Sequence, residues 1–508
     1  MSRTRTTALL GALVLGALAP AEDARADARV PGIGDITAAL ARSSILELDL
    51  AAAHTILDGN DGADPAVAIE RARLAVYEGD CDRAVELLSR GDLAMSDETR
   101  HLGDIARGCA RATAATVIVE DKAKGVWVRL QDDDDRALVP LIVDVADRAR
   151  ESLARDLGVR LPSPIRVELV RDQLTLSAMT GLPYEAAQTT GTVAIAKWGR
   201  VTMLSPRGNG YGWMDTLAHE LSHLALTAGT RDKAPLWLQE GIAKREETRW
   251  REAWPHDDLP SSDSFAAVGI AMNLGRPLDK LGPSIAMLPS AEQAAVAYAE
   301  VASFVRFFAS EVGEDALPRL VVRVKEADGD DPANTALKDV SGLDLAAWNG
   351  RWRQHLSGVS TSIPEELKPG AKIPQMKQVV KAVRLGQLLQ ERGHHRAAAV
   401  EHSIAQLAVP WDASVRCHLA SALLGAGETE SAKALVAKPD EIHGRHGRYW
   451  SLHGLLHPPP AGDGRAFFLG VALDPLSPEV ACEEKPLSDT PADPIKKALC
   501  EAARRVPR

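Results

Sequence analysis

Several features that mark well-known protein classes are missing from this sequence. The net charge is −11 over 508 residues, so the chain lacks the basic excess that favours nucleic acid or an anionic membrane surface as a partner. It has no Gly-x-Ser-x-Gly elbow and no phosphate-binding loop. Beyond residue 30 it has no apolar run long enough to span a bilayer. The composition, with 45% hydrophobic and 25% charged residues, is that of a folded chain with room for roughly three domains.

Cysteine is also scarce, and none of the five cysteines has the C-x-x-C spacing of a zinc or redox site. Cys81 and Cys109 lie close in sequence, and so do Cys482 and Cys500. We expect each pair to form a disulfide and Cys417 to stay free, although sequence alone leaves the connectivity open.

The N-terminus is typical of a secretory signal peptide. Arg3 and Arg5 precede an apolar stretch, Ala8 to Ala19, that is too short to cross a bilayer. Small residues suited to cleavage follow, at either Ala19-Pro20-Ala21 or Ala24-Arg25-Ala26. We therefore expect an exported bacterial protein, periplasmic or secreted, in a compartment that permits disulfides, with no membrane span in the mature chain.

Both ends of the remaining chain have helical patterns. The stretch "RARLAVYEGDCDRAVELLSR" has apolar residues at helical spacing around a Gly-Asp break, which predicts two helices and a turn. Near the C-terminus, similar residues recur 34 positions apart: Leu385 and Leu419, Leu389 and Leu423, Gly393 and Gly427, Ala398 and Ala432, with Gly454 and Ala466 continuing the series. This period resembles the tetratricopeptide repeat (TPR). The resemblance implies a concave surface for a protein partner; bracing of the neighbouring domain is the alternative.

The middle of the chain mixes strand and helix patterns, which predicts an α+β domain. "TVIVED" (116–121) and "VWVRLQ" (126–131) form an expected hairpin, and "IRVELVRD" (165–172) is a further strand. "TVAIA" and "RVTMLS", separated by Lys197-Trp198-Gly199, predict a second hairpin. Helices are expected at about 138–157 and through 290–358.

The motif that carries chemistry is "TLAHELSHLALT", residues 216 to 227, which reads H-E-x-x-H. On a helix, His219 and His223 lie one turn apart on one face, so both imidazoles can bind one zinc ion. Glu220 is one step round and can reach a water molecule without being a ligand. A catalytic zinc takes three protein ligands, and Glu240, 17 residues after His223 in "PLWLQEGIAKREE", is the candidate for the third.

H-E-x-x-H followed by W-L-x-E-G-I-A resembles the gluzincin metallopeptidases of the thermolysin and aminopeptidase N type, and most of all their peptidase MA-like relatives. The resemblance covers roughly residues 116 to 355 and implies a thermolysin-like zincin domain. It implies one Zn²⁺ per chain, held by His219, His223 and Glu240. Glu220 is then the general base that draws a proton from a zinc-activated water, and the substrate is a peptide or protein. Tyr298, in "AYAEVASFVRFF", is expected to support the oxyanion, with a core tyrosine as the alternative.

The sequence departs from that family at one position. Thermolysin-type members have an acid four residues after the ligand Glu, where it orients a ligand histidine, and this chain has Lys244 there. Gln239, Asp215 and Glu247 are the candidates to replace it. The resemblance also suggests that the strand from Arg200 to Leu204 binds substrate backbone by strand addition.

The expected organisation is a signal peptide at 1–26, an N-terminal helical, TPR-like region at 33–115, a peptidase MA-like zinc metallopeptidase domain at 116–358, a linker at 359–379 and TPR-like repeats at 380–508. One alternative is a catalytically inactive zincin-fold protein that acts as an exported binding scaffold through its repeats. Another is a scaffold without metal. His443, His446, His453 and His457 are expected to be polar positions of the repeat region, with a second metal site as the alternative.

Overall fold

A computed structural model describes residues 32–60, 63–93, 96–207, 211–254, 257–258, 260–364, 367–369, 376–437, 443–458, 465–482 and 494–505. The expected signal peptide at 1–26 lies outside these residues, as does part of the expected linker. The described chain is mostly helical and holds one five-stranded mixed sheet, compatible with the α+β class. None of its helices is both long and apolar enough to cross a membrane.

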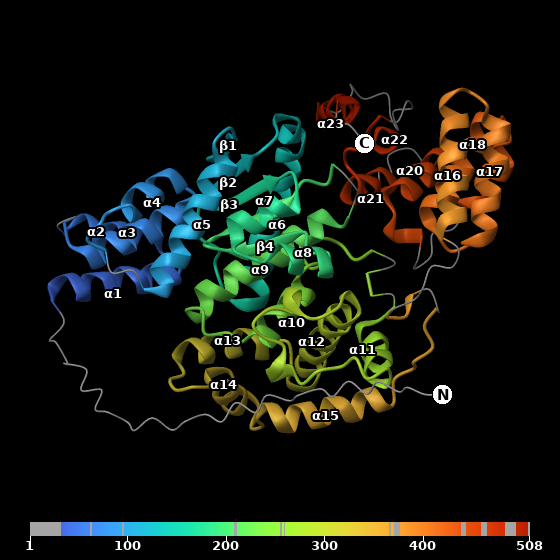
Figure 1. Ribbon diagram of the computed structural model, residues 1–508. Helices are drawn as coiled ribbons and strands as arrows, with labels where there is room; N and C mark the ends of the chain where they lie inside the picture. The colour runs from blue at the N-terminus through green and yellow to red at the C-terminus, as the bar shows by residue number, and fades with distance from the viewer. Residues whose placement is uncertain are drawn as a thin grey trace, which may run out of the picture.

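The N-terminal helices lie along one side of the sheet, on the left of Figure 1. They are α1 (Ile33–Leu46), α2 (Leu50–Asp58), α3 (Pro65–Glu78), α4 (Cys81–Leu88) and α5 (Asp97–Thr113). The Gly-Asp break is the turn between α3 and α4: Gly79 has a left-handed φ of 80°, and the Asp80 carboxylate caps α4 at the Arg83 N–H. The disulfide between Cys81 and Cys109 joins α4 to α5, as predicted.

The sheet has the strand order β1-β2-β3-β5-β4. Its strands are β1 (Val117–Asp121), β2 (Val126–Leu130), β3 (Ile165–Val170), β4 (Ala194–Lys197) and β5 (Arg200–Leu204). The antiparallel pairs β1–β2 and β4–β5 confirm the two predicted hairpins. The expectation that the strand from Arg200 to Leu204 adds a substrate strand is wrong, because β5 is already paired with β3 and β4. The free edge on that side is β4.

The two faces of the sheet have different neighbours. Val167 and Leu169 of β3 belong to the main apolar core, which includes residues of α6 (Val139–Leu157) and α9 (Trp213–Thr230). On the other face, the buried Glu168 carboxylate binds Arg129 at 2.9 Å and Arg200 at 2.8 Å. Both guanidinium groups also donate to carbonyls at the end of α3, at Gly79 and Val76. This buried ionic network joins the N-terminal helices to the sheet, because each of its charges is paired.

The remaining elements of the middle region surround α9. Before it come η1 (Asp133–Leu138), α7 (Gln173–Thr180) and α8 (Tyr184–Thr190). After it come α10 (Leu236–Glu246), α11 (Ser262–Ala271), η2 (Leu278–Lys280), η3 (Ile285–Met287), α12 (Ala291–Val312), α13 (Ala316–Glu326), α14 (Pro332–Ser341) and α15 (Leu345–Ser357). A Cβ at Gly241 of α10 would lie 2.4 Å from Val305 Cγ2 and 2.7 Å from the Val301 carbonyl oxygen. Glycine is needed there because α10 and α12 pack with their backbones in close approach.

The C-terminal helices, on the right and top of Figure 1, fall into two groups. The first contains α16 (Met376–Glu391), α17 (His395–Ala408), α18 (Ala413–Gly425) and α19 (Thr429–Leu435), and their buried side chains form small cores of their own. The second contains η5 (His443–Arg445), α20 (Gly447–Leu456), α21 (Arg465–Leu473), α22 (Pro478–Ala481) and α23 (Pro494–Arg505). The last three of these helices add residues to the main core, and Trp213 Nε1 donates to the Val471 carbonyl at 3.1 Å. A disulfide joins Cys482 to Cys500, as predicted, and Cys417 is a free, buried cysteine.

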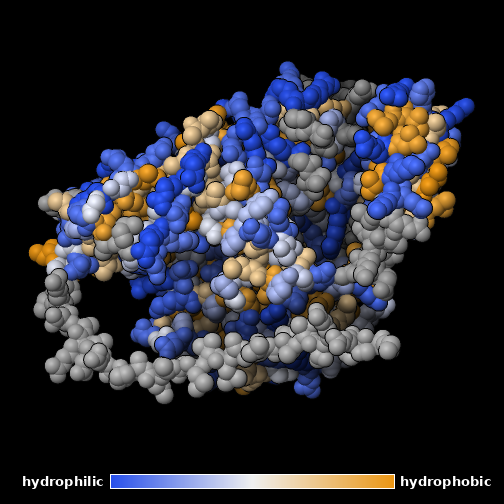
Figure 2. All heavy atoms as spheres, in the orientation of Figure 1, coloured by the Kyte–Doolittle hydropathy of each residue, from blue (hydrophilic) through white to orange (hydrophobic). Residues whose placement is uncertain are grey.

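The 34-residue period corresponds to repeated turns. Gly393 and Gly427 have φ of 77° and 84° and lie in the α16–α17 and α18–α19 connections. Gly454, in contrast, lies inside α20, so the period does not continue as a turn at that position. One face of α17 is apolar and exposed at Val400, Ile404 and Leu407. Figure 2 shows the hydrophobic side chains that gather over this group of helices.

Candidate metal centre

The structure brings His219, His223 and Glu240 together. The two histidines are on α9 and the glutamate is on α10, and a turn with residues Arg231 and Asp232 in the left-handed region connects these helices. The Nε2 atoms of the two imidazoles are 3.3 Å apart. Glu240 Oε2 lies 3.4 Å from His219 Nε2 and 3.5 Å from His223 Nε2. Three potential ligand atoms therefore form a nearly equilateral triangle.

The outer ring nitrogen of each histidine has its own partner. Glu247 Oε2 is 3.3 Å from His219 Nδ1, and Gln239 Oε1 is 3.2 Å from His223 Nδ1. Because both partners are acceptors, each Nδ1 carries the proton and each Nε2 presents a lone pair to the triangle. Of the three candidates left open by the sequence, Asp215 does neither job, since it binds Trp250 and Arg251 instead.

The position of Lys244 is explained by the same contacts. Its ammonium group lies 2.5 Å from Glu247 Oε1, so Lys244 neutralises and holds the carboxylate that faces His219. Glu247 is seven residues after Glu240, two helical turns, which returns it to nearly the same face of the helical segment. Glu247 takes the place of the family's acid at the position of Lys244.

The electrostatics of this cluster favour a cation. Burial disfavours a charged imidazole, but the carboxylates of Glu240 and Glu247 outweigh it and raise the pKa of His219 to about 10. The neighbouring imidazoles overcome the burial of Glu240 and hold its pKa well below the usual range. Glu240 Oε2 is buried and has no hydrogen-bond donor in the described part of the chain. A buried carboxylate oxygen without a donor is costly unless a positive charge compensates it.

Glu220 lies beside the triangle but outside it. Its carboxyl group is buried, and burial raises its pKa, while the imidazoles of His223 and His219 act in the opposite direction. The backbone N–H of Ala196 in β4 donates a hydrogen bond to this carboxylate. The sequence offered no signal for the Ala196 contact, because it depends on how the edge strand passes over α9.

Tyr298 of α12 is on the same cleft. Its ring centroid is 6.4 Å from that of His219, and the two rings meet at a steep angle. The tight packing at Gly241 brings α12 this close to α10. The structure therefore brings all five residues singled out from the sequence to one site.

The cleft at the cluster has a volume of about 440 Å³. Besides the residues above, its walls come from the edge strand β4, from the loops near Pro183 and Pro283, and from Thr227 and Asp232 at the end of α9. Lys197, the last residue of β4, also lines it. Sequence analysis placed Lys197 in a hairpin and gave it no role.

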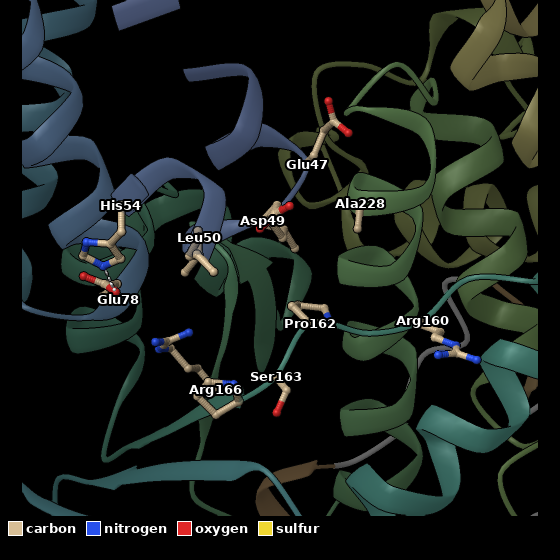
Figure 3. Close-up of a pocket in the computed structure, with 13 residues that line it drawn as sticks. Glu47, Asp49, Leu50, His54, Glu78, Arg160, Pro162, Ser163, Arg166 and Ala228 are labelled. Atoms are coloured by element: carbon tan, nitrogen blue, oxygen red, sulfur yellow. Dashed lines mark hydrogen bonds and ion pairs between the residues drawn. The ribbon is translucent and has the colours of Figure 1, made fainter. Parts of the chain in front are cut away.

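A second pocket lies between the N-terminal helices and the start of β3, with a volume of about 480 Å³. Figure 3 shows that His54 and Glu78 point toward one another across one side of it, at 2.8 Å, with Arg166 nearby. It shares no lining residue with the metal cluster, and its Glu47 carboxylate already binds Arg231 and Lys325. Among the described residues, only His219, His223 and Glu240 meet the geometric requirements for a metal site of three or more ligands.

Comparison with protein-family models gives no match, and comparison with curated proteins and with solved structures gives none either.

Proposed function

We propose that this protein is an exported, zinc-dependent metallopeptidase with a zincin-like catalytic unit. The observation that carries the proposal is the triangle of His219 Nε2, His223 Nε2 and Glu240 Oε2, with sides of 3.3, 3.4 and 3.5 Å. Ligand atoms at the ~2.0–2.1 Å bond length of a tetrahedral zinc site are about 3.3–3.4 Å apart, so the three side chains fit this ion in their present positions.

The charges of the site support a divalent cation. Glu220, Glu240 and Glu247 supply three carboxylates, and Lys244 supplies one ammonium group. With both imidazoles neutral, as metal binding requires, two negative charges stay uncompensated in a buried region. A dication balances them. The donor set of two imidazoles and one carboxylate is also the set that catalytic zinc sites use.

The protein's own groups suit peptide hydrolysis. Bound zinc would supply a Lewis acid that polarises a carbonyl and makes water acidic near neutral pH. Glu220, whose pKa is raised by burial, can take a proton from water and return it to the leaving amine. The Tyr298 hydroxyl can donate to the oxygen that becomes negative in the transition state. The free edge of β4 offers backbone groups to an extended peptide, in place of β5.

Export is part of the proposal. The disulfides Cys81–Cys109 and Cys482–Cys500 are compatible with an oxidising compartment, and the apolar N-terminal stretch supports secretion. The turns at Gly393 and Gly427 support a TPR-like arrangement of α16 to α19.

The test begins with the zinc content of the purified protein beside a Glu240→Ala variant. We expect about one zinc per chain in the wild type and a weakened or empty site in the variant. The next variant, Glu220→Gln, should keep zinc and the melting temperature while it loses cleavage of a quenched fluorescent peptide library by a factor of at least ~10². Equal turnover in the Glu220→Gln variant, or no zinc in the reconstituted wild type, would overturn the proposal.

The exposed apolar face of α17 favours a second candidate, a binding scaffold that has kept the zinc site without turnover. Val400, Ile404 and Leu407 are 60%, 50% and 84% exposed, which is unusual for three apolar residues on one helix face. A biological activity that survives Glu220→Gln in full, but is lost when these three residues are changed to Ser, would favour the scaffold.

A further inference from the structure

The cleft at the metal cluster continues into a second cavity. That cavity, called here the side chamber, has a volume of about 370 Å³ and shares Ala196, Lys197, Thr227 and Asp232 with the cleft. Its other walls come from α1, α3 and α5 and from the tip of the β4–β5 hairpin. A molecule that lies along β4 at the cluster therefore reaches the side chamber next to Lys197.

The hairpin tip is held in place by the N-terminal helices. Trp198 and Gly199 form the turn, with φ of 56° and 68°. The Trp198 ring meets the Tyr77 ring edge-on at 6.0 Å, and its Nε1 donates to the Thr180 carbonyl at 3.4 Å. A Cβ on Gly199 would lie 2.9 Å from Tyr77 Cδ1, so glycine is required there by close approach as well as by φ. The packing fixes the backbone of Lys197 at the junction of the two cavities.

Most charges around the side chamber are already neutralised. Glu98 accepts hydrogen bonds from Arg42 at 3.2 Å and from Arg73 at 3.1 Å. Arg73 also binds Glu70 at 2.8 Å, so these four groups balance one another. Lys197 is different: within the described ranges it has no ion pair and no hydrogen bond, and its Nζ lies 5.0 Å from the centroid of the Trp198 ring.

Asp232 is the other charged group at the junction. Burial raises the pKa of its carboxyl group, while a hydrogen bond with Thr227 and the charge of Lys197 act against that shift. No ion pair of 4.0 Å or less joins Asp232 to Lys197 in the described residues. The Lys197 ammonium group thus faces the junction of cleft and chamber without a bound counter-ion from the protein.

We propose that Lys197 selects substrates that carry a carboxylate, which it binds at the entrance to the side chamber. The inference rests on the proposed function, since it supposes that a peptide lies along β4 across the metal cluster. Strand addition fixes the register between a peptide and Ala194–Lys197, so one substrate position is brought beside the ammonium group. An Asp or Glu side chain and the C-terminal carboxylate of a peptide offer the same chemistry.

The experiment measures peptide binding to the zinc-loaded Glu220→Gln protein, in which turnover does not interfere. The probes are fluorescent peptides of one sequence in which successive positions carry Glu, Gln or Lys, each made with a free and an amidated C-terminus. We expect Glu to bind about fivefold more tightly than Gln at one position, as for a partly exposed ion pair. Lys197→Gln should abolish that difference, and Lys197→Glu should turn it into a preference for Lys.

The matched control is Lys122→Gln, the same change at an exposed lysine in the β1–β2 turn, at the opposite edge of the sheet. It should leave the preference unchanged. A difference that depends on Glu against Gln assigns the carboxylate to a side chain, and one that disappears on amidation assigns it to the C-terminus. Either result supports the inference.

Three outcomes overturn it: equal binding of all peptides, a preference for Glu that survives Lys197→Gln, or a preference for Lys that is lost in Asp232→Asn. Failure of the proposed function looks different. If the unmodified zinc-loaded protein cleaves none of the peptides, while Glu220→Gln still binds carboxylates through Lys197, the peptidase is refuted and the selectivity of the cleft stands.

Discussion

Replacement of Glu247 by Gln tests whether the zinc affinity depends on the groups behind the ligands. Glu247 Oε2 is 3.3 Å from His219 Nδ1, and the same carboxylate is paired with Lys244 at 2.5 Å. Glu247→Gln keeps the size of the side chain but removes the negative charge that orients the imidazole. Loss of such a partner weakens metal binding by about 10–100-fold, or ~1.4–2.7 kcal/mol. We expect the zinc dissociation constant to rise by that factor.

The assay is competition for zinc with a chromophoric chelator of known affinity, at fixed pH and with the melting temperature as a check on folding. Glu252→Gln, at an exposed residue near the same helix, is the control and should leave the dissociation constant unchanged. The sign of a second variant sharpens the test. Lys244→Gln removes the positive charge that competes for Glu247, so zinc should bind as tightly as in the wild type or more tightly.

Two results would refute this reasoning. One is an unchanged dissociation constant in Glu247→Gln, which would mean that His219 is held by packing alone. The other is an equal loss of affinity in Lys244→Gln and Glu247→Gln, which would indicate a general disturbance of the end of α10 rather than an effect of charge on His219.

Two further predictions concern stability. Gly241→Ala should destabilise the fold by about 1–3 kcal/mol, because its Cβ would meet Val305 and the Val301 backbone, and thermal unfolding beside the open position Gly350→Ala measures this loss. Burial raises the pKa of Glu300 to about 7, so between its ordinary value of 4.5 and about 7 the folded state binds more protons than the unfolded state. Stability should therefore fall as pH rises through this window, and denaturant unfolding at pH 5, 6, 7 and 8 should give a smaller slope for Glu300→Gln; an identical slope would contradict the argument.

Much of the local structure follows from short-range patterns. Alternating apolar residues on both sides of Lys197-Trp198-Gly199 predict the β4–β5 hairpin, and the structure confirms it. The spacing of four between His219 and His223 puts both imidazoles on one face of any helix. The disulfides Cys81–Cys109 and Cys482–Cys500 join the cysteines nearest in sequence.

The strand order is different, since it depends on contacts between distant segments. The pattern of Arg200 to Leu204 resembles that of an edge strand as much as that of a central one, and the substrate-binding expectation for it was wrong for this reason. β5 lies between β3 and β4 only because β3, some thirty residues earlier in the chain, pairs with it in parallel. Periodicity describes the two faces of a strand and does not identify its neighbours.

By itself the sequence determined the helices and hairpins, the pair of histidines and the residues that could join them, because helix geometry and alternation act over a few residues. Only the tertiary structure decided that Glu247 and Gln239, and not Asp215, stand behind the two histidines, and that Ala196 contacts Glu220. It also decided that Lys197 faces the cleft without a counter-ion. These outcomes depend on how α9, α10 and β4 pack against one another, and packing depends on side chains from the whole chain at once.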